Sequence, residues 1–134
     1  MKEKLSKELQ EKLNEFLDFK EEGLLQLKKA LSFKEFSYNQ SEINEVQSFY
    51  EKNMNQKTRC LIYIYIGEAL ISNANGRWSI GKLKKDEAYG YPIILDYGKN
   101  GKDNPRICPN VWLNKLEKKN LRNPLSVLIE YCKN

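Results

Sequence analysis

Apolar residues recur every three or four positions along the first part of the chain, separated mainly by lysine and glutamate. In the opening segment these positions are Leu5, Leu9, Leu13, Phe16 and Leu17. This spacing places them on one face of a helix and predicts an amphipathic helix over about residues 3–20. Gly23 interrupts the pattern, and the leucines that follow it predict either a kinked continuation or a second short helix.

A second helical period begins after residue 40. Ser41 is a suitable N-cap residue, and the apolar positions after it mark one face of a helix that ends near Met54. Those positions are Ile43, Val46, Phe49 and Tyr50.

The most apolar segment, residues 60–71, fits two kinds of structure. Its β-branched and aromatic residues favour a strand that turns at Gly67, whereas its length and continuous apolar character suit a buried helix. We predict a helix, because Thr58 offers a cap and Asn75 with Gly76 provides a terminus.

After Gly76, glycines separate short runs that favour strands, over residues 77–83, 91–97 and 106–108. Helical spacing returns beyond Pro109, and Asn123 with Pro124 predicts the start of a last helix. The expected fold is a single α+β domain over residues 1–134, in which N-terminal helices pack on a small three-stranded antiparallel meander that C-terminal helices follow.

The composition narrows the chemistry that the protein can perform. The chain has no histidine, so catalysis or metal binding by imidazole is excluded. Its three cysteines, Cys60, Cys108 and Cys132, are widely spaced, which predicts small buried side chains rather than disulfides or a metal site. Glycine-rich phosphate-binding motifs are absent from the sequence, and we expect no cofactor and no metal. The N-terminus lacks the features of a secretory signal, so the expected location is the cytoplasm, with no membrane partner.

Glu68 is the candidate for acid–base chemistry, because it follows Gly67 in the most apolar part of the chain. The alternative is a structural carboxylate that accepts hydrogen bonds from an arginine, a tyrosine or loop amides and joins the sheet to the helix. We expect this structural role, together with Gly67, Arg77 and Trp78: Trp78 packs in the core, and Arg77 pairs with Glu68 or points to solvent. A small enzyme built around Glu68 remains an alternative function.

Basic and aromatic residues are concentrated in the second part of the chain. Residues 1–57 hold ten lysines and arginines against eleven acidic residues, whereas residues 58–134 hold thirteen against seven, so the two parts carry charges of −1 and +6. Exposed tyrosines are common anchors of protein interfaces. For Tyr89, Tyr91 and Tyr97, partial burial of the rings is the simpler expectation. Such a surface also suits nucleic acid, which is the first alternative function, ahead of an enzyme built around Glu68, although no nucleic-acid-binding motif accompanies it. The expected partner-binding residues are Tyr89, Tyr91, Tyr97, Lys84, Lys85, Lys99 and Lys102.

Two short motifs carry a resemblance. Tyr65, Gly67 and Glu68 form a Tyr-x-Gly-Glu pattern in the predicted buried helix, and Gly76 with Trp78 forms a Gly-x-Trp pattern in the strand that follows. This part of the chain, residues 58–112, resembles small bacterial proteins of the toxin-immunity kind. The resemblance implies a non-enzymatic protein that binds and occludes a cognate toxin. Inhibitors of nuclease toxins are often acidic, so the basic charge of this chain implies a toxin with an acidic surface, or contacts made by the N-terminal helices.

Overall fold

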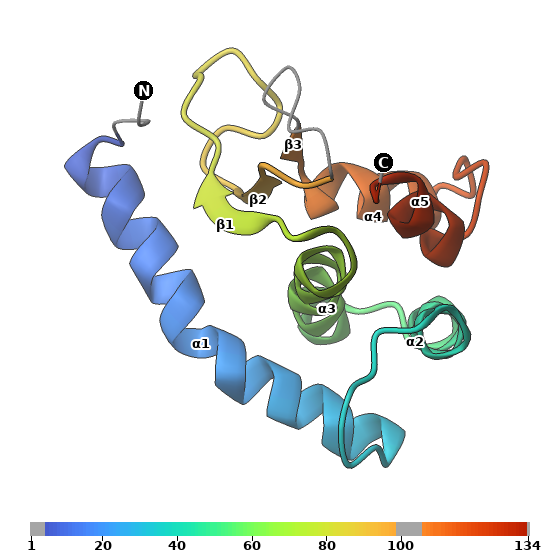
Figure 1. Ribbon diagram of the computed structural model, residues 1–134. Helices are drawn as coiled ribbons and strands as arrows, with labels where there is room; N and C mark the ends of the chain where they lie inside the picture. Colours follow the sequence, from blue (N-terminus) through green and yellow to red (C-terminus); the bar gives the residue numbers. More distant parts are fainter. Residues whose placement is uncertain (1–4, 99–105, 134) are drawn as a thin grey trace.

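The computed structural model describes residues 5–98 and 106–133, which form five helices and a small three-stranded sheet (Figure 1). In chain order the elements are α1 (Lys7–Leu31), α2 (Gln40–Lys52), α3 (Gln56–Ala74), β1 (Arg77–Ile80), β2 (Pro92–Leu95), β3 (Arg106–Ile107), α4 (Pro109–Glu117) and α5 (Leu125–Tyr131). The predicted α+β class is confirmed, with N-terminal helices, an antiparallel three-stranded meander and C-terminal helices.

Helix α1 is continuous through Gly23, so of the two predicted alternatives a continuation is confirmed and a second short helix is wrong. The Ser6 hydroxyl caps its start by accepting a hydrogen bond from the Leu9 amide at 3.2 Å. Gly23 is buried where α1 crosses α3, and a Cβ atom built on it would lie 2.6 Å from the Cδ1 atom of Ile64. The glycine therefore allows the two helices to approach closely instead of ending the first one.

Asparagine side chains cap the next two helices, rather than the predicted Ser41 and Thr58. Asn39 accepts a hydrogen bond from the Glu42 amide at 2.8 Å, and Asn55 accepts one from the Thr58 amide at 2.9 Å. Each cap precedes its predicted position by two or three residues and satisfies an amide that the first helical turn leaves unpaired. The helix predicted over residues 60–71 is confirmed as the middle of α3.

Helix α3 lies at the centre of the molecule, where helices α1, α2, α4 and α5 and strand β2 all contact it. Every residue from Leu61 to Gly67 is buried. The helices therefore do not form a single layer on the sheet, because α3 is enclosed on several sides. All three cysteines were expected to be buried, but Cys60, near the start of this helix, is exposed and Cys108 is only partly buried; the expectation is confirmed for Cys132. None of the helices in the described ranges is long and apolar enough to cross a membrane.

The sheet has the order β1-β2-β3 and is antiparallel throughout. Trp78 pairs with Ile94 across β1 and β2, and Ile94 pairs with Ile107 across β2 and β3. The strands are shorter than the runs that predict them, because the chain leaves the sheet after Ile80. That residue packs against Leu9 and Leu13, so the N-terminal half of α1 covers one end of β1.

The C-terminal helices are joined to the core by polar contacts. Glu117 on α4 accepts hydrogen bonds from the hydroxyl of Tyr50 and from Nε of Arg59, the second at 2.7 Å, so it links α2, α3 and α4. The amide of Leu125 donates to the side chain of Gln47 at 2.8 Å, which holds the start of α5 against α2.

Candidate functional site

The connection between β1 and β2, residues 81–91, is a compact loop whose two ends meet; we call it the Ω-loop. The Gly81 amide donates to the Tyr91 carbonyl at 3.0 Å, and the Gly90 amide donates to the Gly81 carbonyl at 2.9 Å. A Cβ atom on Gly81 would lie 2.0 Å from the Ala88 carbonyl oxygen, so only glycine fits at this neck. The loop projects from the sheet on the side away from α3 (Figure 1). Compact loops of this kind frequently carry function.

The inner side of the Ω-loop is anchored to the sheet. Ala88 is buried and packs in a small cluster with Ile93 and Leu95. Asp86 accepts a hydrogen bond from the Ala88 amide at 3.2 Å and forms an ion pair with Arg106 of strand β3. The Ala88 amide and then the Arg106 guanidinium stabilise the charged carboxylate, so the pKa of Asp86 lies below its ordinary value. These contacts anchor the inner side of the loop to strands β2 and β3.

The outer side of the Ω-loop presents apolar, aromatic and basic side chains to solvent. Leu83, Tyr89 and Tyr91 are 59%, 37% and 43% exposed, and Lys84 and Lys85 are exposed beside them. The expected partial burial is confirmed for Tyr89 and Tyr91, each of which still exposes more than a third of its surface. Four of the residues predicted to contact a partner lie on this one loop.

The other three predicted contact residues lie elsewhere. Tyr97 is half-buried, packs against the main core, and has its Cβ atom 3.2 Å from the position that a Cβ on Gly76 would take. Burial raises the pKa of its hydroxyl. Lys99 and Lys102 lie outside the described residues.

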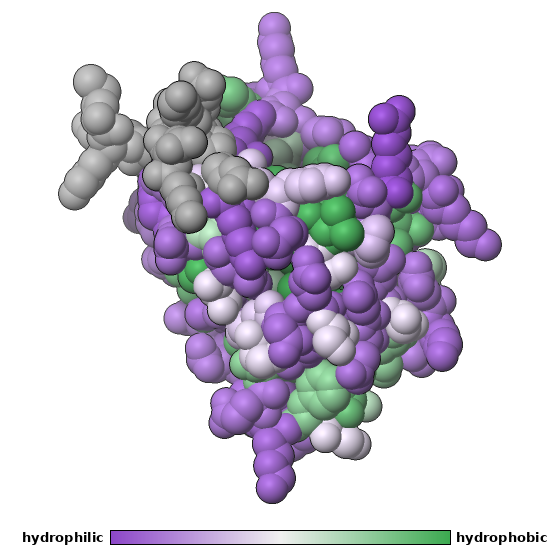
Figure 2. Space-filling model, turned by 45° about the vertical axis from the view of Figure 1, so that its right-hand side comes forward, coloured by the Kyte–Doolittle hydropathy of each residue, from purple (hydrophilic) through white to green (hydrophobic). Residues whose placement is uncertain are grey.

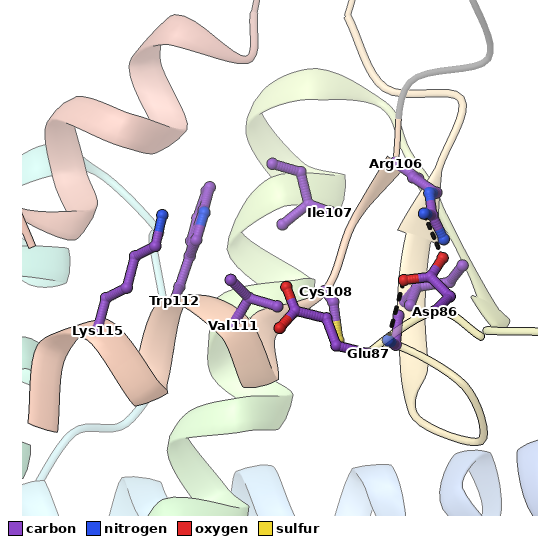
Figure 3. A pocket seen from close by; sticks show the side chains of 10 residues that line it. Asp86, Glu87, Arg106, Ile107, Cys108, Val111, Trp112 and Lys115 are labelled. Carbon is purple, nitrogen blue, oxygen red and sulfur yellow. Dashed lines mark hydrogen bonds and ion pairs between the residues drawn. The ribbon is translucent and has the colours of Figure 1, made fainter. Parts of the chain in front are cut away.

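A cleft of about 220 Å³ opens between the Ω-loop, strand β3 and helix α4 (Figure 3). Asp86 and Arg106 face each other on one side, and Trp112 and Lys115 stand side by side on α4. The side chain of Glu87 extends from the loop toward α4. Apolar side chains, chiefly Ile93, Ile107 and Val111, complete the lining together with Cys108.

Sequence reasoning missed this cleft. Its residues come from three separate segments, and no spacing along the chain joins Asp86 to Arg106 or either of them to Trp112. The available signals were local. The turn-forming residues around Asp86 indicated a loop, and Trp112 and Lys115, three positions apart, indicated neighbours on one helical face. Neither signal identifies the opposite wall.

The second predicted site, around Glu68, is an intramolecular junction. Glu68 accepts a hydrogen bond from the Trp78 indole nitrogen at 2.8 Å and forms an ion pair with Lys20 of α1 at 3.3 Å. The carboxylate thus joins α1, α3 and β1, with partners other than those we expected. Arg77 pairs with Asp96 at 2.8 Å, not with Glu68.

A second carboxylate that the sequence did not single out is more deeply buried. Glu42 is 8% exposed and accepts hydrogen bonds from the amides of Ser37 and Tyr38, both at 2.8 Å, and from the Tyr65 hydroxyl at 2.7 Å. All of these donors hold the α1–α2 connection against α3. Its arrangement is that of a structural anchor.

Comparison with protein-family models, with curated proteins and with solved structures gave no match to this chain. Within the described ranges, no group of three or more acidic or cysteine side chains is placed to hold a metal ion. The function therefore has to be argued from the geometry of the Ω-loop and the cleft beside it.

Proposed function

We propose that this protein is a non-enzymatic binding protein of the toxin-immunity kind, and that it blocks its protein partner by docking the Ω-loop against it. One observation carries the proposal: a loop anchored on its inner side presents Leu83, Tyr89 and Tyr91 to solvent. Tyrosines held in place before binding lose little conformational entropy in an interface, which is why they serve as anchors.

The contacts of one buried and two partly buried carboxylates also support a binding role. Glu42, Glu68 and Glu117 each accept hydrogen bonds from side chains or amides of other elements, and these bonds join helices to one another or to the sheet. A catalytic acid or base needs access to a substrate and a pKa suited to its task. The geometry of these three groups is explained by their structural contacts.

The exposed side chains of the loop suit a mixed polar interface, because Leu83, Tyr89 and Tyr91 occur together with Lys84 and Lys85. On the face of the molecule shown in Figure 2, apolar side chains also form separate small patches between hydrophilic ones. Interfaces of non-obligate complexes, whose proteins are also stable as separate molecules, have this character, with a few anchor residues inside a polar rim. A standard interface of about 800 Å² per partner extends well beyond the loop itself, so residues of α4 that line the cleft beside the loop, including Lys115, would take part.

Nucleic acid is the second candidate, because exposed basic residues continue from the Ω-loop to the end of α4. Lys84, Lys85, Lys115, Lys118 and Lys119 are all exposed. Binding that depends on phosphate contacts weakens steeply as salt rises. A titration with a DNA duplex and a single-stranded RNA between 50 and 300 mM salt, about the range over which such contacts are lost, distinguishes the two functions.

Site-specific photo-crosslinking in the native host tests the proposal. A photoreactive amino acid replaces Tyr89 in one variant and Tyr131 in a control; Tyr131 is an exposed tyrosine on α5, 62% exposed. We expect one protein to be crosslinked in a stoichiometric amount from position 89 and not from position 131. Equal crosslinking at both positions, or recovery of nucleic acid in place of a protein, would contradict the proposal.

A further inference from the structure

The cleft behind the Ω-loop has a balanced set of charges. Its ionisable lining consists of the carboxylates Asp86 and Glu87 and the cations Arg106 and Lys115. Asp86 and Arg106 already neutralise each other as an ion pair. Glu87 and Lys115 are exposed on opposite walls, one on the loop and one on α4. An incoming charged group would meet attraction from one wall and repulsion from the other, so the electrostatics favour an uncharged occupant.

The remaining lining is suited to a flat apolar group. Ile107, Val111 and Trp112 are partly buried and form the part of the wall that lies between the charges (Figure 3). The cleft volume of about 220 Å³ is below that of pockets that enclose drug-sized ligands, about 300–1,000 Å³. It suits the insertion of a single large side chain. A tyrosine or phenylalanine ring can stack against or stand on edge to the indole of Trp112 while it covers the aliphatic side chains.

Outside the cleft the charge is no longer balanced. Lys84 and Lys85 precede Asp86 on the loop, and Lys118 and Lys119 follow Lys115 at the end of α4, so exposed positive charge continues beyond the cleft along both of these segments. Hot spots of protein interfaces have this arrangement, in which a buried anchor enters a pocket and complementary groups form a rim. The rim complements acidic residues on the partner.

Resting on the proposed function, we infer that the cleft is the anchor pocket of the interface, and that it receives one aromatic side chain from an acidic surface of the partner protein.

Four short peptides test this inference without the partner itself. The probes are acetyl-Asp-Tyr-Asp-amide, acetyl-Asp-Ala-Asp-amide, acetyl-Asp-Arg-Asp-amide and acetyl-Lys-Tyr-Lys-amide. Binding is followed by NMR through the indole N–H resonance of Trp112, which the Trp112→Phe variant distinguishes from that of Trp78. We expect saturable shifts only with the two tyrosine peptides. The acidic one should bind about fivefold more tightly, the effect of about two favourable surface charge pairs.

A variant that fills the cleft provides the structural control. Val111→Trp places a large ring in the cleft and should abolish the shifts, whereas Val127→Trp, at a partly buried valine of α5, should leave them unchanged. The comparison among peptides on the unmodified protein needs no variant, so it holds even if Val111→Trp fails to fold.

The outcomes are separate from those of the proposed function. Three results would each overturn the anchor pocket. The alanine or arginine peptide could shift the Trp112 resonance as much as the tyrosine peptides do, the lysine-flanked peptide could bind more tightly than the acidic one, or no peptide could shift the resonance. A partner crosslinked at Tyr89 would in that case still stand as the partner of the Ω-loop.

Discussion

The indole nitrogen of Trp78 donates a hydrogen bond of 2.8 Å to Glu68, and this bond joins strand β1 to helix α3. Beneath it the ring lies directly against Gly67, where a Cβ atom would come within 2.1 Å of two ring carbons. Phe16 of α1 packs edge-on to the same ring, with the ring centroids 4.7 Å apart. The motif residues Gly67, Glu68 and Trp78 therefore form one packing unit between a helix and the sheet.

Replacing Glu68 with glutamine should lower stability slightly. The amide oxygen of Glu68→Gln can still accept the bond from Trp78, while the ion pair with Lys20 is lost, so we expect a decrease in the free energy of unfolding of about 1 kcal/mol. Urea unfolding measures it. The Lys20→Gln variant should show a similar decrease, because it removes the same pair. A reaction that the purified protein catalyses and that Glu68→Gln abolishes would contradict the structural role.

Gly67→Ala should be far more damaging than the same change at Gly23. At Gly67 the new methyl group meets the Trp78 ring, which its own hydrogen bond holds in place. Overpacking against such a neighbour costs about 1–3 kcal/mol, partly offset by the better helix propensity of alanine. At Gly23 it meets the flexible end of the Ile64 side chain, not a ring that a hydrogen bond holds in place. Thermal unfolding of both variants should show a clear loss for Gly67→Ala and little change for Gly23→Ala. Equal losses of stability would show that the Trp78 ring moves aside for the new methyl group as easily as the Ile64 side chain does.

Glu42→Gln should be costly, although the substitution conserves shape. The Ser37 and Tyr38 amides and the Tyr65 hydroxyl all donate to this carboxylate. An amide side chain offers one acceptor oxygen and turns an N–H₂ group toward a donor, so we expect a loss of about 2–3 kcal/mol. Glu45→Gln, an exposed position one turn along α2, is the matched control and should change stability by less than about 0.5 kcal/mol. Denaturant unfolding of the two variants side by side tests the difference.

Buried tyrosines should make the protein unstable in alkali. Burial is the main cause that raises the pKa of Tyr63 above its ordinary value of 10.0, with the neighbouring Cys108 thiol as a smaller cause. Stability from such a group is fully present below pH 10, where both states hold the proton. It is lost as pH rises toward the folded-state pKa, because the unfolded chain releases the proton first.

Each such group should lower the free energy of unfolding by about 1.4 kcal/mol per pH unit above pH 10. Cys132 contributes in the same direction, since burial raises the pKa of its thiol to about 11. Tyr63→Phe removes one titrating group and should flatten the decline measured by urea unfolding at several pH values. A decline as steep as that of the unmodified protein would show that Tyr63 does not contribute.

The sequence predicted where the helices lie better than it predicted where elements end or which residues they contact. Residues 60–71 looked ambiguous because an element that is buried on all sides loses the polar face that makes a helix recognisable. Gly23 looked like a helix break because its role, the close approach of Ile64, depends on a residue far along the chain. The predicted strands were too long. Strand β1 ends where the neck of the Ω-loop begins, and local strand propensity does not indicate that position.

The candidate site was predicted only in part. Tyr89, Tyr91, Lys84 and Lys85 were identified because tyrosine and lysine in a turn-rich segment point to a surface loop. The wall formed by Trp112 and Lys115 was not, because it depends on how α4 packs against α3 and so on tertiary structure. The partners of Glu68 were missed for the same reason, since Lys20 precedes it by more than forty residues.

The affinity of the crosslinked partner for three forms of this protein tests the central claim most directly. Isothermal titration calorimetry compares the unmodified protein, the double variant Tyr89→Ala, Tyr91→Ala, and the control Tyr131→Ala. We predict that the double variant weakens binding by about 30-fold or more, the loss of about one interface hot spot, and that the control binds as tightly as the unmodified protein. Unchanged affinity in the double variant, with each protein folded, would show that the Ω-loop is not the binding surface.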